Sequence, residues 1–181
     1  MFLATNTVVS SQSQAAVNHS IDDGFGDSVT GQKPVFFPMD GWDVWKNETC
    51  PPSICFLLPP TSSAFDKTYT QTTAHSGGFG PITITFDFTG IALYIFFILS
   101  NNNTGGIISG TSANFTLDGS LVGSFTHEPN PDTLEFQFNV LAFSTTDIEN
   151  ITHEMMIISS ALGNDPSAES FLLIFDYALY T

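Results

Sequence analysis

A strand pattern over residues 81–100 organises the chain. Between Ile82 and Phe88, apolar residues alternate with threonine and aspartate, which is the period of two of a strand with one buried face. After a Thr-Gly pair, the run Ile91–Leu99 is almost wholly apolar and rich in β-branched and aromatic residues. Such a run is typical of a strand covered on both faces and is too short to cross a bilayer as a helix. The pattern predicts central strands of a β-sandwich.

Shorter strand patterns surround this stretch, at 64–73, 113–118, 121–127, 133–140, 152–159 and 171–180. Asp118-Gly119-Ser120 joins two of them, and Asp-Gly favours a tight hairpin turn. Residues 144–150 are expected to form a loop or a helical turn. Because no 3.6-residue period persists, we predict an all-β antiparallel sandwich with very little helix. The residues expected to be mostly buried are Ile84, Phe86, Tyr94, Phe96, Phe115, Leu117, Phe125, Phe136, Phe138, Ile157 and Phe175. In the strand 133–140, Leu134 and Val140 are expected to face inward as well.

The chain is expected to consist of an N-terminal arm and one domain. Residues 1–20 are polar and without period, so we expect a mobile N-terminal arm, with one edge strand around Thr7–Val9. Residues 21–181 are expected to form a single β-sandwich domain, which suits their length. Within it, prolines and aromatic residues dominate 32–60, which predicts a long structured loop with one or two short strands.

Composition narrows the function classes. Hydrophobic residues make up 42% of the chain, so it is not a disordered polypeptide. The net charge is −15, and Lys33, Lys46 and Lys67 are the only lysine or arginine side chains. This scarcity argues against nucleic acid and anionic membranes as partners, because both favour clustered basic residues. The acidic balance fits solubility in an acidic exterior.

The cysteines and the Asn-x-Ser/Thr sequons favour a protein located outside the cell. Cys50 and Cys55, the two cysteines, are separated by a proline-rich loop and are expected to form a disulfide rather than a metal site, since no histidine lies nearby. Asn-x-Ser/Thr sequons predict glycosylation at Asn47, Asn102, Asn114 and Asn150. We expect an extracellular or cell-surface protein. No convincing signal peptide and no membrane span is recognised in these residues.

Three aspartates near the start of the domain are candidate metal ligands. Asp22, Asp23 and Asp27 lie on a loop with glycines between them, and carboxylates on such a loop can supply the oxygens that calcium accepts. The spacing is not that of an EF-hand. The alternative is that these side chains cap turns by binding their own backbone.

A pair of tryptophans is the candidate ligand site. Trp42 and Trp45 could stack on a sugar ring while Asp43 binds hydroxyl groups. The alternative is that Trp42 fills the bottom of the sandwich beside the cysteine loop. Catalytic signals are weaker, since no serine or cysteine nucleophile motif is present. His153, next to Glu154, is interpreted as a structural strand residue because neighbours in a strand point to opposite faces.

The ordered motifs carry a resemblance. IDDGFGDSVTG, AFDKTYTQTT, ITFDFTGIALYIFFIL, FTLDGSLVGSF, EFQFNVLAF and NITHEMMII follow one another as in a galactose-binding-like jelly roll. More narrowly, residues 20–180 resemble a set of extracellular proteins from mushroom-forming fungi. The resemblance implies a jelly-roll fold and a surface location but lends no activity. Jelly rolls of this type often hold a structural calcium near the first strand, and Asp176 on the closing strand could join it.

Three functions follow from these observations. The leading hypothesis is a non-catalytic recognition module of an extracellular surface, with carbohydrate as its ligand. The second is a structural protein that self-associates through exposed strand edges or through the N-terminal arm. The third is a glycan-active hydrolase, which requires two carboxylates facing one cleft.

Overall fold

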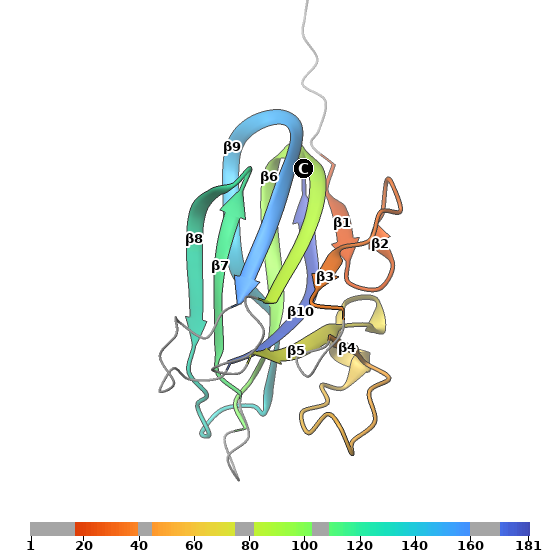
Figure 1. The fold of residues 1–181 in the computed structure, drawn as a ribbon, viewed down its shortest axis with the longest axis vertical. Coiled ribbons are helices and arrows are strands. Elements are labelled where there is room, and N and C mark those ends of the chain that lie inside the picture. Colours follow the sequence, from red (N-terminus) through yellow and green to blue (C-terminus); the bar gives the residue numbers. More distant parts are fainter. Residues whose placement is uncertain (1–16, 40–44, 75–81, 103–108, 160–170) are drawn as a thin grey trace, which may run out of the picture.

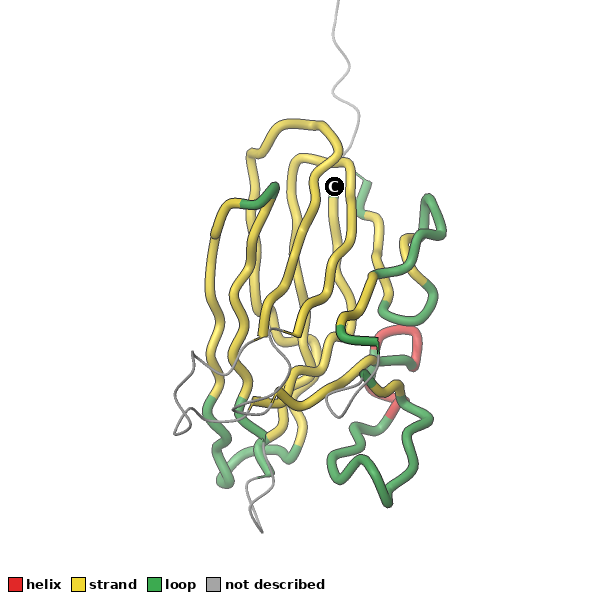
Figure 2. The backbone as a smooth tube through the Cα atoms, viewed as in Figure 1, coloured by secondary structure: helices red, strands yellow, loops and turns green. Residues whose placement is uncertain are grey.

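The computed structural model describes residues 17–39, 45–74, 82–102, 109–159 and 171–181. Within these ranges strands dominate, and helix is limited to two short 3-10 turns, η1 (Thr61–Ser63) and η2 (Phe65–Lys67), as Figure 2 shows. All strand pairs are antiparallel. The predicted all-β antiparallel sandwich is therefore confirmed.

Two long strands connect the two layers of the sandwich. β6 (Ile82–Ser100) and β9 (Phe136–Ser159) pair with each other along most of their lengths, and both fold over at the same end of the molecule (Figure 1). The first half of β6 pairs with the second half of β9 in one layer. Beyond the fold, the second half of β6 pairs with the first half of β9 in the other layer. This two-stranded ribbon thus belongs to both sheets.

The bend in β6 occurs at Gly90, where its pairing with β9 is interrupted. At this point β6 forms backbone hydrogen bonds with Thr181 instead of with β9. The N–H of Ile91 donates to the carbonyl of Thr181 (2.6 Å), and the N–H of Thr181 donates to the carbonyl of Ala92 (3.1 Å). A Cβ atom on Gly90 would lie 2.4 Å from the Thr181 carbonyl oxygen. Glycine is therefore required by the close approach of the two backbones.

The first sheet contains β3 (Val35–Phe37), the first half of β6, the second half of β9, β7 (Thr111–Leu117) and β8 (Ser120–His127). The second sheet contains β2 (Gly26–Asp27), β1 (His19–Asp22), β10 (Phe171–Tyr180), the second half of β6 and the first half of β9. β5 (Thr70–Ala74) extends it beside the start of β10, and β4 (Lys46–Asn47) pairs with β5.

The main core lies between the two sheets. Its largest members alternate along the central strands, as the period of two requires, and include Ile84, Phe86, Phe88, Leu93, Ile95, Phe97, Phe115, Met155, Ile157 and Phe175. A smaller cluster lies on the outer face of the second sheet, where the segment 57–69 covers Ile98, Leu172 and Ile174. The second sheet is thus covered on both faces over part of its length.

Burial matches the sequence expectation in the main core and departs from it elsewhere. Ile84, Phe86, Phe115, Ile157 and Phe175 are buried as predicted. Val140 is only half-buried. The same holds for six other residues that were expected inside: Tyr94, Phe96, Leu117, Phe125, Phe136 and Phe138. Leu134 was predicted to face inward but is 75% exposed, because β9 begins two residues later at Phe136.

The predicted loop at 144–150 is wrong. These residues continue β9 as extended chain and form the crossover between the two sheets, so the segment 152–159 is not a separate strand. Asn139 and Asp147 take positive φ angles of 54° and 61°, where asparagine and aspartate are tolerated better than other residues. A polar stretch that looks like a loop is here the bend of one long strand.

The predicted strand at 64–73 is found only in its second part. Its first residues form η2, in which Asp66 and Lys67 take positive φ angles of 46° and 67°. The N–H of Phe65 donates to the carboxylate of Asp176, 3.0 Å away on β10, which holds this turn against the second sheet. Only from Thr70 does the segment become β5.

The boundary of the N-terminal arm shifts slightly. β1 begins at His19, so the last two residues of the predicted arm 1–20 already belong to the second sheet. The expected edge strand at Thr7–Val9 lies outside the described residues. Between 32 and 60, the predicted short strands are found as β3 and β4.

Candidate functional site

An aromatic surface lies on the second sheet beside the part that the segment 57–69 covers. On β6, Leu93, Ile95 and Phe97 point into the main core, so Tyr94 and Phe96 point to the outside. Tyr94 pairs with Leu179 and Phe96 pairs with Tyr177 on β10, while Leu141 on β9 lies opposite Phe96. We call these five residues the aromatic face: Tyr94, Phe96, Leu141, Tyr177 and Leu179.

A three-ring stack forms one border of the aromatic face. The Tyr177 ring stacks on Phe96, with centroids 4.6 Å apart, and Phe65 from η2 stacks on its other side at 4.2 Å. The Tyr177 hydroxyl donates to Oδ1 of Asn139 (3.2 Å). Because both ring faces of Tyr177 are occupied, ring surface is offered to solvent by the half-buried Tyr94 and Phe96 rather than by Tyr177.

The chemistry of this surface suits a neutral ring. Flat aromatic and aliphatic side chains can contact the apolar face of a pyranose. Polar groups lie at its edges: Ser144 is directly opposite Tyr94, Ser20 is opposite Leu179, and Asn139 is exposed beside Tyr177. Sequence reasoning missed this surface because the apolar run 91–99 predicted burial on both sides. The only signal was the presence of rings at alternate positions, Tyr94 and Phe96.

Two of the four predicted metal ligands are turn caps. Oδ1 of Asp22 accepts hydrogen bonds from the N–H groups of Gly24 (2.8 Å) and Phe25 (2.6 Å). Asp27 accepts the N–H of Val29, both donors of Thr30, and the Tyr180 hydroxyl at 2.9 Å. Burial alone would raise the pKa of Asp27, but these hydrogen bonds outweigh it and lower the pKa. Asp22 and Asp27 therefore follow the turn-cap alternative.

Asp23 and Asp176 are as buried as Asp22 and Asp27 but differ from them in hydrogen bonding. Each is almost fully enclosed, with exposed fractions of 4% and 0%. Asp23 accepts one hydrogen bond from Thr70 (2.6 Å) and Asp176 accepts one from Phe65, but Oδ1 of Asp23 and Oδ2 of Asp176 have no hydrogen-bond partner among the described residues. Burial raises the pKa of each carboxyl to about 7, and the charge of Asp23 adds to the shift at Asp176.

Of the four predicted calcium ligands, Asp23 and Asp176 are the ones whose buried oxygens lack a hydrogen-bond partner among the described residues. A buried carboxylate oxygen without a donor is strongly disfavoured unless it is protonated or binds a cation. No group of three or more acidic, histidine or cysteine side chains in the described ranges is arranged to hold a metal ion. The four predicted ligands therefore do not act as one set. The free oxygens of Asp23 and Asp176 are the groups available to a calcium ion, which would neutralise their charges.

Of the predicted tryptophan platform, the structure describes Trp45 alone. Trp45 is half-buried, its ring lies 5.0 Å from that of Phe36, and its Nε1–H donates to the Phe37 carbonyl (3.1 Å). Trp45 therefore helps to close one edge of the main core. Trp42 and Asp43 lie outside the described residues.

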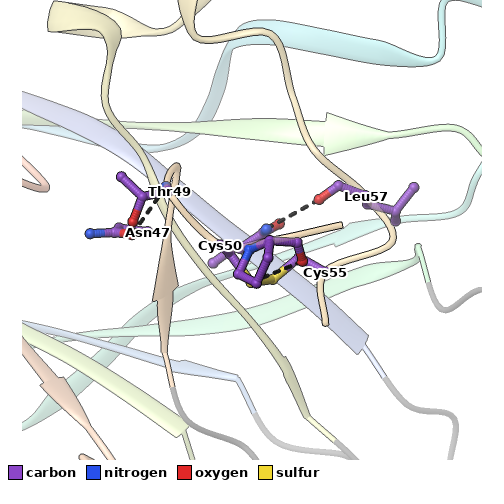
Figure 3. The surroundings of a disulfide bond; sticks show 7 residues. Asn47, Thr49, Cys50, Cys55 and Leu57 are labelled. Carbon is purple, nitrogen blue, oxygen red and sulfur yellow. Dashed lines mark hydrogen bonds between the residues drawn. A yellow bond between two sulfur atoms is a disulfide. The ribbon is translucent and has the colours of Figure 1, made fainter. Parts of the chain in front are cut away.

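The predicted disulfide is present. Cys50 and Cys55 are bonded, and their Cα atoms are 6.0 Å apart. Figure 3 shows this disulfide together with the neighbouring residues Asn47, Thr49 and Leu57. Oδ1 of Asn47 accepts hydrogen bonds from the N–H and the hydroxyl of Thr49 (3.1 and 2.6 Å), so the sequon at this position forms its own turn. The bond closes one loop at the end of β4.

The other predicted glycosylation sites differ in setting. Asn150 is exposed in the β9 crossover. Asn102 is half-buried after β6, and its amide donates to Glu135. Asn114 is half-buried on β7 in the first sheet. Occupancy of these positions stays a prediction.

Comparison with known proteins supports the fold class of the chain. No family model and no curated protein matches the chain. Among solved structures, a family 35 carbohydrate-binding module from Clostridium thermocellum is similar with a TM-score of 0.50 at 8% identity, over 91% of this chain and 97% of that one. In the part of the chain that the structure describes, no helix is long and apolar enough to cross a membrane.

Two further similarities are weaker. The Agl-KA catalytic domain has a TM-score of 0.47 at 10% identity, over 98% of this chain and 30% of that one. The CBM36-1 domain of a xylanase from the hindgut metagenome of Trinervitermes trinervoides has a TM-score of 0.36 at 12% identity, over 60% of this chain and 74% of that one. No inference rests on these two. The chain therefore has a β-sandwich fold of the kind found in a carbohydrate-binding module.

Proposed function

We propose that this protein is an extracellular, non-catalytic recognition module that binds neutral carbohydrate on its aromatic face. The observation that carries the proposal is the pair of half-buried rings, Tyr94 and Phe96, on the open part of the second sheet. The similar fold of a carbohydrate-binding module supports it. A net charge of −15 with three lysines and no arginine disfavours an anionic ligand.

The proposed location rests on separate observations. The Cys50–Cys55 disulfide persists in oxidising compartments outside the cytosol. The resemblance to extracellular proteins of mushroom-forming fungi extends the proposal to a fungal cell surface. Neither observation depends on which ligand the aromatic face binds.

Binding is favoured over hydrolysis by the position of the unusual carboxyl groups. Glycoside hydrolysis requires two carboxyl groups that face the substrate. Among the described residues, the carboxyls with pKa values raised to about 7 are Asp23 and Asp176, and both are enclosed beside β5 and η2. A polymeric substrate cannot reach them there.

The test is binding to a panel of neutral polysaccharides and a glycan array, followed by titration calorimetry with each positive ligand. Tyr94→Ala is expected to weaken binding about tenfold, since burying an aromatic side chain contributes about 1.5–3 kcal/mol. Phe37→Ala, which removes an exposed ring from the other sheet, is the matched control and should bind as the unchanged protein does. Equal losses in both variants, or no carbohydrate binding at all, would refute the proposal.

A further inference from the structure

The outer face of the first sheet carries no charge over two neighbouring rows of side chains, in which apolar residues are mixed with hydroxyl and amide residues. Strand pairing places one residue from each of five strands in each row, all pointing away from the main core. One row is Phe37, Thr83, Ile158, Asn114 and Ser124. The other is Val35, Thr85, Met156, Thr116 and Leu121. We call these ten residues the outer patch.

Three apolar side chains of the outer patch are exposed to solvent. Val35, Phe37 and Leu121 are 51%, 56% and 68% exposed. No charged side chain lies in either row, although the chain carries 18 acidic residues. The exposed apolar side chains lie at the two edges of the patch, on β3 and β8, and the half-buried Ile158 and Met156 lie between them, so a flat apolar partner would find contacts across the whole face.

A sequon lies within this patch. Asn114 is on β7, which pairs with β8 on one side and β9 on the other, so it has neighbours across both strand gaps: Ser124 and Ile158. Side chains two apart in a strand share a face, so Asn114 and Thr116, the two specifying residues of the sequon, both point outward. Both are half-buried rather than enclosed.

We propose that the occupant of the outer patch is an N-linked glycan on Asn114. In the secretory pathway, the Asn114 amide nitrogen bonds to the anomeric carbon of a lipid-linked oligosaccharide. The bond from that carbon to the lipid pyrophosphate breaks, and the amide loses one proton. The first sugar is then attached beside Ile158 and Met156, and its apolar face packs on them.

The composition of the patch favours a saccharide over a protein partner. Hydroxyl groups of Thr83, Thr85 and Ser124 alternate with the apolar side chains, so a sugar finds donors and acceptors as well as apolar contacts. The glycan then keeps the patch from associating with a second copy of the chain, since glycans are bulky and solubilising. This role is independent of carbohydrate binding on the aromatic face.

The experiment uses the full chain secreted from a eukaryotic host. Peptide mass spectrometry measures occupancy at Asn114, and light scattering with dye binding measures association and apolar exposure. Asn114→Gln is expected to bind a hydrophobic dye several-fold more strongly and to self-associate. Asn150→Gln removes an exposed sequon from the crossover and should change neither readout. Thr116→Ser keeps the sequon and should remain glycosylated and monomeric.

Enzymatic deglycosylation of the folded protein covers the case in which Asn114→Gln does not fold. Removal of the glycan from the native chain should produce the same dye binding and association. An unoccupied Asn114 overturns the proposal, and so does a deglycosylated protein that stays monomeric and binds no additional dye. Self-association of the glycosylated chain that Leu121→Ser abolishes would show that a second copy, not the glycan, covers the patch.

Discussion

Nδ1 of His153, in the second half of β9, lies 2.7 Å from Oδ2 of Asp118 in the turn between β7 and β8. Nε2 of the same ring lies 2.8 Å from the backbone carbonyl oxygen of Glu149 in the β9 crossover. Both partners are acceptors, so both ring nitrogens must donate, which requires the protonated imidazolium. His153 therefore ties the hairpin turn to the crossover, as a structural residue of a strand.

This pairing predicts a pH-dependent stability. The hydrogen bond to Asp118 raises the pKa of His153 above its usual value of 6.5, against the opposing effect of burial. The stabilisation is fully present below pH 6.5 and is lost as the pH rises through the folded-state pKa. An NMR titration should give His153 a pKa above 6.5, and His153→Gln should remove this part of the pH dependence of the unfolding free energy. A His153 pKa at or below 6.5 would contradict the interpretation.

A second pH dependence arises from Asp23 and Asp176. Their pKa is about 7 in the folded chain, against 3.8 when unfolded, so between these values the folded state holds protons that the unfolded state has released. In EDTA, stability should therefore fall as the pH rises from about 4 to about 7. A shift of about three pKa units corresponds to about 4 kcal/mol near neutral pH, and the buried amide N–H groups of an asparagine, left without an acceptor, offset about half of it, so Asp176→Asn should stabilise the protein by about 1–2 kcal/mol. Denaturant unfolding across this range measures it; an unchanged slope in Asp176→Asn would count against the raised pKa.

Calcium should oppose that loss of stability. The unpaired oxygens of Asp23 and Asp176 are the expected ligands, and an ion that binds only the folded state raises the melting temperature with its concentration. At a concentration of about 100 Kd, the gain is about 2.7 kcal/mol. Thermal unfolding in EDTA and in millimolar calcium should show the shift.

Matched variants locate the ion. Asp23→Asn should abolish the calcium response, whereas Asp27→Asn should keep it, because Asp27 is already bonded to Thr30 and Tyr180. The absence of any calcium-dependent shift in the native chain would leave Asp23 and Asp176 as a buried acid pair that holds protons. A response that persists in Asp23→Asn would place the ion elsewhere.

Gly90→Ala tests the bend of β6. The added Cβ would meet the Thr181 carbonyl at 2.4 Å, so backbone must move, and we expect a loss of about 1–3 kcal/mol in unfolding free energy. Gly110→Ala is the control, since its Cβ would lie no closer than 3.5 Å to any neighbour. Urea unfolding of both variants provides the comparison. If the two lose equally, the contact between the chain end and the bend contributes nothing specific.

Local pattern was sufficient for the fold class and for several elements. The alternation Ile82–Phe88 depends on the period of the backbone alone, so it predicted correctly that Ile84 and Phe86 are buried. The Asp118-Gly119 turn is also local, because aspartate and glycine adopt the positive φ angles of 50° and 78° that the tight hairpin needs. The disulfide followed from the short spacing of Cys50 and Cys55.

The candidate site depended on contacts between distant segments. A period of two shows that a strand has two faces, but it does not show what covers the second one. Ile98 is covered by the segment 57–69, whereas Tyr94, four residues earlier on the same face, is not. The bend of β9 likewise depends on pairing with β6, and no local signal distinguishes its residues from a loop.

The aspartates show the same division. From the sequence alone, Asp22, Asp23 and Asp27 were three equivalent carboxylates on one loop. Asp22 and Asp27 are satisfied mainly by nearby backbone N–H and hydroxyl groups, a local outcome that turn chemistry anticipates. Asp23 instead meets β5 and is buried near Asp176, more than a hundred residues away, so its free oxygen and raised pKa come from tertiary packing. The sequence determined which groups could carry charge, and the packing of β1, β5 and β10 decided which buried carboxyl oxygens were left without a hydrogen-bond donor.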